Sequence, residues 1–143
     1  MESTNTRVQR IFADTCYWIA LIHIKDQLHQ KAMEISGSYE QLYIVTSQLV
    51  LVEFLDFCSR NVVLKGKAVQ AIEKLLSHPN IEIVPQTAEL FVRAYDYYKK
   101  MDDKTWSLTD CSSFEIMKEQ GITKALTADA HFTQCGFSAL LLE

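Results

Sequence analysis

The chain has 143 residues, of which 48% are hydrophobic and 22% are charged, so it can bury the core of a globular protein. Its formal net charge of −4 argues against the broad basic surface of a protein that binds duplex nucleic acid. Acids gathered around bound cations would also lower the net charge, so a nucleic-acid enzyme is not excluded. We predict a single domain over residues 1–143.

The four cysteines are widely separated and form no C-x-x-C pair: Cys16, Cys58, Cys111 and Cys135. This spacing favours reduced, buried thiols over a disulfide framework or structural zinc. Residues 1–7 are polar and are not followed by the apolar region of a signal peptide, and no apolar run is long enough to cross a bilayer. We therefore expect a cytoplasmic protein with no membrane segment.

Short apolar runs alternate with helical patterns along the chain. The runs predicted as strands lie at residues 11–13, 42–45, 81–84, 122–126 and 137–142. The segments with helical spacing lie at residues 15–22, 25–36, 47–60, 62–77, 88–99, 105–120 and 129–132. This alternation predicts right-handed βαβ crossovers. The expected fold is therefore α/β, a three-layer α/β/α sandwich with a central, mainly parallel sheet of four to five strands.

The helix predicted at residues 88–99 carries an aromatic-rich stripe. Its members are Leu90, Phe91, Ala94, Tyr95 and Tyr98. A stripe of this kind faces the core more often than it forms a binding platform. We therefore predict that these side chains are buried.

Asp14 directly follows the first predicted strand, whose residues Ile11, Phe12 and Ala13 are apolar on both faces, as in a covered parallel sheet. Ligands of open α/β sheets bind at this carboxyl edge, which makes Asp14 a candidate functional residue. Asp is also a preferred N-cap, so capping of the following helix is a competing interpretation, and the commoner one for an isolated Asp.

Three further acids are predicted at the same edge. Asp129 closes the fourth strand, Glu53 lies in the helix after the second strand, and Asp110 opens a helix. Each also has an ordinary structural interpretation. Glu53 cannot be separated from Asp56 by periodicity, Asp110 completes a capping box with Ser107, and Asp129 fits the N-cap of a short helix.

Carboxylates crowded at one edge would repel one another and raise at least one pKa unless cations lie between them. Sites made of oxygen ligands select hard ions, and Mg²⁺ or Mn²⁺ keeps open positions for a substrate phosphate. Such ions polarise phosphoryl oxygens and activate water. The convergence therefore predicts metal-dependent hydrolysis of phosphodiester bonds.

Four segments of the chain, in this order, resemble PIN-domain ribonucleases, and most closely the VapC-type toxins of bacterial toxin–antitoxin pairs. They are residues 11–15 (IFADT), 46–53 (TSQLVLVE), 107–114 (SLTDCSSF) and 125–132 (ALTADAHF). No single segment is decisive, but the set in this order is specific and covers nearly the whole chain.

The resemblance implies a catalytic, metal-binding quartet that holds Mg²⁺ or Mn²⁺: Asp14, Glu53, Asp110 and Asp129. Thr15 and Ser107 would be its hydrogen-bonding neighbours. Some relatives carry another acid where this chain has His131, which would contact substrate phosphate or have a structural role. The implied biology is cleavage of a structured cellular RNA, inhibition by a cognate antitoxin, and homodimerisation. Candidate phosphate contacts are Lys25, Arg60, Lys65, Lys67, Lys99, Lys100 and Lys104.

Two other functions stay open at this point. A PIN-like module that binds RNA or protein without cutting it would keep the same acids. A phosphatase that uses a strand-end Asp as nucleophile normally needs a second acid two residues later, where this chain has Cys16. The sequence therefore favours a metal-dependent endoribonuclease.

Overall fold

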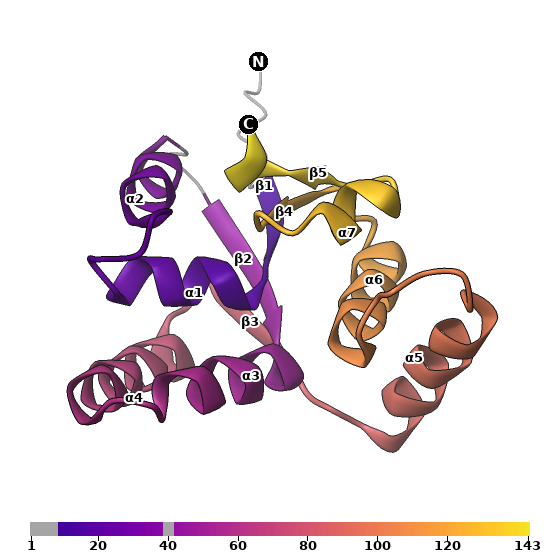
Figure 1. The fold of residues 1–143 in the computed structure, drawn as a ribbon, viewed down its shortest axis with the longest axis horizontal. Helices are drawn as coiled ribbons and strands as arrows, with labels where there is room; N and C mark the ends of the chain where they lie inside the picture. The colour runs from indigo at the N-terminus through magenta and orange to yellow at the C-terminus, as the bar shows by residue number, and fades with distance from the viewer. Residues whose placement is uncertain (1–8, 39–41) are drawn as a thin grey trace, which may run out of the picture.

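The computed structural model describes residues 9–38 and 42–143, and these are built around one parallel sheet (Figure 1). The strand order is β3-β2-β1-β4-β5. The strands are β1 (Gln9–Ala13), β2 (Leu42–Ser47), β3 (Ile81–Val84), β4 (Lys124–Leu126) and β5 (Ser138–Ala139). Every pairing is parallel, and β1 lies at the centre between β2 and β4. The predicted parallel sheet is confirmed.

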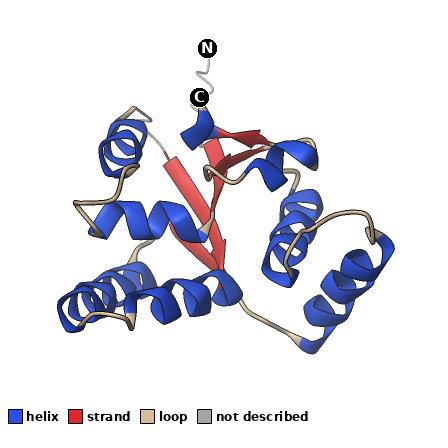
Figure 2. Ribbon diagram, viewed as in Figure 1, coloured by secondary structure: helices blue, strands red, loops and turns tan. Residues whose placement is uncertain are grey.

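Helices cover both sides of the sheet, as Figure 2 shows. In the orientation of Figure 1, α1 (Thr15–Ile22), α2 (His29–Gly37), α3 (Gln48–Cys58) and α4 (Val62–Ser77) lie on the left. The helices on the right are α5 (Ala88–Lys100), α6 (Leu108–Gln120) and α7 (Ala130–Gln134). The three-layer α/β/α arrangement is therefore confirmed. None of the helices in residues 9–38 and 42–143 is long and apolar enough to cross a membrane.

Strand β1 is buried on both faces because Ile11, Phe12 and Ala13 have no exposed surface. Its Phe12 ring lies 6.5 Å from the Phe132 ring of α7, which in turn packs edge-on against Phe114 of α6 at 4.9 Å. These three rings connect β1 to α6 and α7. They therefore fix the first turns of α6 and α7 relative to the end of β1.

Most predicted boundaries agree with the structure within a few residues, and the departures have local causes. Helix α2 begins at His29 rather than residue 25, because the Asp26 side chain accepts from Leu28 N at 2.8 Å and holds a turn there. The fifth strand was predicted too long. It ends at Ala139 and continues as the 3₁₀ helix η1 (Leu140–Leu142), in which Leu141 N donates to Thr127 O.

The prediction that the stripe of α5 is buried is confirmed for Leu90 and Ala94 and is wrong for its three aromatic residues. The side of α5 that packs against the core carries Leu90, Ala94, Tyr97 and Met101. The aromatic residues Phe91, Tyr95 and Tyr98 are 48%, 45% and 48% exposed. The buried set and the exposed aromatic set each repeat every three to four residues. They are offset by one position, about 100° around the helix, so periodicity alone could not tell which set faces the core.

All four cysteines are free thiols, as predicted. Cys58 and Cys111 are buried, whereas Cys16 and Cys135 are only partly buried, so the expectation that all four are buried was wrong. Cys16 lies in the first turn of α1, next to Asp14, and this position brings it to the edge of the sheet that is described next.

Candidate active site

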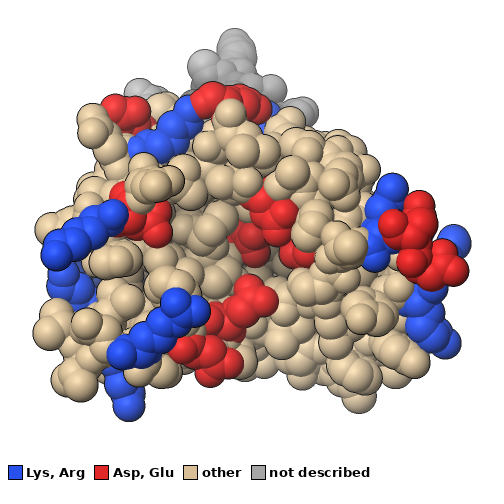
Figure 3. Space-filling view, in the orientation of Figure 1, with Lys and Arg blue, Asp and Glu red and all other residues tan. Residues whose placement is uncertain are grey.

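The four predicted acids come from elements that end or begin at the carboxyl edge of the sheet. Asp14 follows β1 directly, Asp129 precedes α7, Asp110 lies in the first turn of α6, and Glu53 lies in α3. Figure 3 shows acidic side chains gathered in a hollow on this face, with Lys and Arg side chains to either side. A cavity of about 340 Å³ is lined by Asp14, Thr15, Cys16, Ile19, Glu53, Ala128 and Asp129.

Asp14 is buried like Asp110, and each of these two residues is 7% exposed. It occupies the N-cap position of α1 but makes no capping hydrogen bond, so the competing interpretation does not describe its side chain. Its Oδ2 accepts instead from Thr127 Oγ1 at 2.9 Å. Burial raises the pKa of Asp14 to about 7, and the charges of Asp110 and Glu53 act in the same direction.

Glu53 projects into the same hollow from α3. Thr15 Oγ1 donates to Glu53 Oε1 at 2.6 Å, which joins the start of α1 to the middle of α3. Glu53 and Asp56, which periodicity could not separate, are both exposed, but only Glu53 lines the cavity and accepts from Thr15. The structure therefore distinguishes the two acids through the packing of α1 against α3.

Asp110 has two roles at once. Ser107 Oγ accepts from Asp110 N at 3.0 Å and Ser107 N donates to Asp110 Oδ2 at 3.1 Å, so the predicted capping box is confirmed. The same Oδ2 lies 2.9 Å from His131 Nδ1. The capping box therefore fixes the buried Asp110 side chain in the first turn of α6, facing His131.

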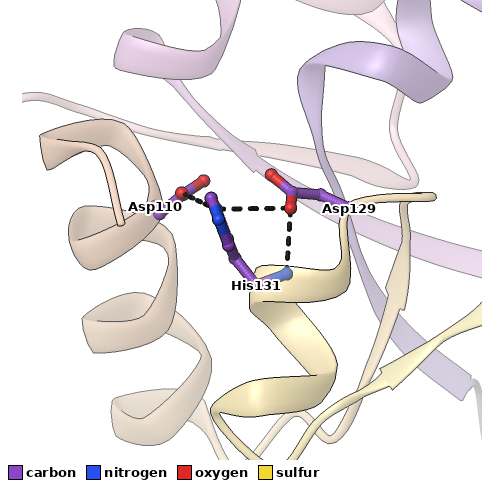
Figure 4. Close-up of side chains that lie close together, drawn as sticks. All are labelled: Asp110, Asp129 and His131. Atoms are coloured by element: carbon purple, nitrogen blue, oxygen red, sulfur yellow. Dashed lines mark hydrogen bonds and ion pairs between the residues drawn. The ribbon is translucent and has the colours of Figure 1, made fainter. Parts of the chain in front are cut away.

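Asp129 is confirmed as the N-cap of α7, because its Oδ1 accepts from His131 N at 2.9 Å. The His131 ring lies between the carboxylates of Asp110 and Asp129 (Figure 4), with Nδ1 3.3 Å from Asp129 Oδ1. One ligand atom from each of these three residues lies within 4.8 Å of the others. His131 is therefore part of the acidic cluster rather than a separate surface residue.

Sequence reasoning missed Thr127, which is fully buried under the acids. Its Oγ1 donates to Asp14 and accepts from Asp129 N at 3.0 Å, and it lies 3.5 Å from Cys16 Sγ. Ala13 pairs with Leu126 in the sheet, so the next residues, Asp14 and Thr127, are neighbours. Only the strand register reveals this contact, and the register was not predictable.

The residues fit a divalent cation. Burial disfavours the ionised form of Asp14 and raises its pKa to about 7, and two neighbouring carboxylates act in the same direction. A bound cation would lower the pKa of Asp14 again, because positive charge favours the ionised carboxylate. Asp110, Asp129 and His131 have ligand atoms close enough to one another to share a cation. Glu53 and Asp14 would add ligands from the other side of the hollow.

Comparisons with known proteins agree with this geometry. The family model of the PIN domain matches residues 11–137. The 23S rRNA-specific endonuclease VapC20 of Mycobacterium tuberculosis, in strains CDC 1551 and H37Rv, is 30% identical over 127 residues, covering 89% of this chain and 95% of the relative. A crystal structure of VapC20, described as a Sarcin-Ricin loop cleaving toxin, superposes with a TM-score of 0.80 over the same shares of both chains. The chain therefore belongs to the PIN domain family.

Proposed function

We propose that this protein is a metal-dependent endoribonuclease that hydrolyses RNA phosphodiester bonds and acts as the toxin of a toxin–antitoxin pair. The observation that carries the proposal is the convergence of Asp14, Glu53 and Asp129 on one cavity at the carboxyl edge of the sheet, with Asp110 beside Asp129. The similarity to a 23S rRNA-specific endonuclease supports RNA as the substrate and makes ribosomal RNA the first candidate.

In this proposal the four acids are the catalytic quartet and hold Mg²⁺ or Mn²⁺. A divalent cation bound there would supply positive charge to the scissile phosphate and would acidify the attacking water. The protein contributes fixed orientation: Thr15 donates to Glu53, and Thr127 donates to Asp14. Ser107 holds Asp110 from its backbone amide. Ligands held by such neighbours need little rearrangement on binding.

The proposal also includes a cognate antitoxin that inhibits the enzyme, a homodimer and a cytoplasmic location, as the resemblance to VapC-type toxins implies. Helices α3 and α4, on the left in Figure 1, expose apolar side chains that are available for protein contacts. A groove of about 420 Å³ between α3, α4 and β3 contains Val52, Leu55 and Leu76, which are 52%, 36% and 66% exposed.

The proposal is tested by incubating the purified full-length protein with ribosomes and with extracted ribosomal RNA, and mapping new RNA 5′ ends. We expect cleavage at a small number of positions with Mn²⁺ or Mg²⁺ and none in excess EDTA. Binding of the RNA without new ends in either metal would instead indicate a PIN module that binds without cutting. Turnover of a small phosphate ester through a phosphoenzyme would indicate the phosphatase alternative.

A second groove, of about 820 Å³, provides a path for RNA beside the acids. It lies between α5 and the loop that enters α6, and its lining includes Tyr95, Tyr98, Lys99 and Lys104. The same loop reaches the acidic cluster, because Thr105 Oγ1 lies 3.4 Å from His131 Nε2. Exposed aromatic rings and lysines are the side chains that hold unpaired bases and phosphates.

We predict that Tyr98→Ala raises the KM for RNA by about tenfold and changes kcat little, since base stacking contributes about 1–3 kcal/mol. The control is Val92→Ala. Val92 lies on the same helix, is 54% exposed and does not line the groove, so its truncation should leave KM unchanged. Steady-state cleavage of one RNA by the three proteins is the measurement. Equal effects of both substitutions would contradict a specific role of the groove.

A further inference from the structure

The position of the His131 ring is not explained by the four-acid site. Its Nδ1 lies 2.9 Å from Asp110 Oδ2 and 3.3 Å from Asp129 Oδ1, so two carboxylate oxygens converge on one nitrogen (Figure 4). A neutral imidazole nitrogen carries at most one proton and can donate one strong hydrogen bond. A single hydrogen bond to Asp110 accounts for the shorter contact, whereas a cation between the three atoms would account for both.

The spacing of the three atoms matches neighbouring ligands of an octahedral ion. With ligand distances of about 2.1–2.2 Å, adjacent donors of such an ion lie about 3 Å apart. The two contacts of Nδ1 fall near this value, and no pair of the three ligand atoms exceeds 4.8 Å. The side chains could therefore enclose one cation with small movements.

The opposite side of the ring has the environment expected of a metal-bound histidine. Its Nε2 lies 3.4 Å from Thr105 Oγ1, which can accept the remaining ring proton and leave Nδ1 free for a metal. Thr105 precedes Trp106, which is 5% exposed, packs against Phe114 and donates to Gln134 Oε1 at 2.9 Å. Thr105, whose Oγ1 is the acceptor, is therefore held in place by the firmly packed residue that follows it.

We propose that His131 Nδ1 is a direct metal ligand beside Asp110 and Asp129, and that it makes this site prefer Mn²⁺ to Mg²⁺. The inference rests on the proposed function, because it takes the acidic cluster to be the cation site. Imidazole binds transition-metal ions well, whereas Mg²⁺ favours oxygen ligands and gives up its waters reluctantly. One imidazole ligand should therefore raise the affinity of the site for Mn²⁺ relative to its affinity for Mg²⁺.

The test measures Mn²⁺ binding directly, without RNA. Wild-type protein and His131→Asp are titrated with Mn²⁺ and with Mg²⁺ by calorimetry, and the Mn²⁺ complexes are examined by pulsed electron paramagnetic resonance for coupling to a directly bound ¹⁴N. The His131→Asp variant should fold, since an acid in the first turn of α7 is favoured by the helix dipole. The control is His78→Gln in the exposed turn before β3.

We expect ¹⁴N coupling in the wild-type protein and in His78→Gln, and none in His131→Asp. The variant should still bind Mn²⁺, but its preference for Mn²⁺ over Mg²⁺ should fall by about tenfold. Bound Mn²⁺ without ¹⁴N coupling in the wild-type protein would overturn the role of His131 and leave the proposed nuclease intact. Failure of the wild-type protein to bind either cation would overturn the proposed metal site itself.

Discussion

Asp110→Asn is expected to slow RNA cleavage by roughly 10³-fold while the fold stays intact. The Asn oxygen can still accept from Ser107 N, so the capping box that starts α6 survives. The substitution removes the negative charge of a side chain that is 9% exposed and lies 2.9 Å from His131 Nδ1. The measurement is the single-turnover cleavage rate in Mn²⁺, with circular dichroism as the check on folding.

The control for this experiment is Asp103→Asn. Asp103 lies in the loop before α6, its side chain is 70% exposed, and its ion pair with Lys104 is a surface pair that contributes little to stability. This variant should cleave RNA at the wild-type rate. If Asp110→Asn also cleaved at the wild-type rate in Mn²⁺, the assignment of the acidic cluster as the catalytic site would be wrong.

Asp14→Asn should abolish activity and yet stabilise the metal-free protein at high pH. The pKa of Asp14 rises from 3.8 to about 7 on folding, chiefly because the side chain is buried. Between these values the folded state holds a proton that the unfolded state has lost, so stability falls as the pH rises through this range. Above about pH 7 the full cost of the buried charge is present, roughly 2–4 kcal/mol. Asn avoids that cost because it cannot ionise.

The measurement is urea unfolding of both proteins in EDTA at pH 4 and pH 8. The two should differ little at pH 4, and the variant should be the more stable at pH 8. Added Mn²⁺ should then stabilise the wild-type protein more than Asp14→Asn, because ligand binding to the folded state raises its stability and the variant has lost one proposed ligand. Equal stability of the two proteins at pH 8 in EDTA would show that folding does not raise the pKa of Asp14.

The convergence of the acids was predictable to different degrees. Asp14 and Asp129 follow apolar runs, and a parallel sheet places the ends of such runs together. Glu53 was ambiguous, because helical periodicity gives Glu53 and Asp56 similar positions at the border of one face. Only the packing of α1 against α3, which brings Thr15 to Glu53, separates them. That packing depends on long-range contacts that no local pattern contains.

Other features depended on information that the sequence does not express locally. The hydrogen bond from Thr127 to Asp14 follows from the register between β1 and β4. The exposure of Tyr95 and Tyr98 depends on which of two similar stripes of α5 faces the core. Strand and helix positions were predicted well because apolar periodicity and capping residues are local signals.

The two outer strands of the sheet are poor templates for another chain. Strand β5 has two residues, and β3 has four, carries the charged Glu82 and is followed at once by Pro85, which has no backbone N–H to donate. Edge strands that are short, charged or followed by proline disfavour the edge-to-edge strand pairing that leads to aggregation. Copies of this protein should therefore stay dispersed when concentrated, and any stable assembly should use helical surfaces instead of a continuous intermolecular sheet.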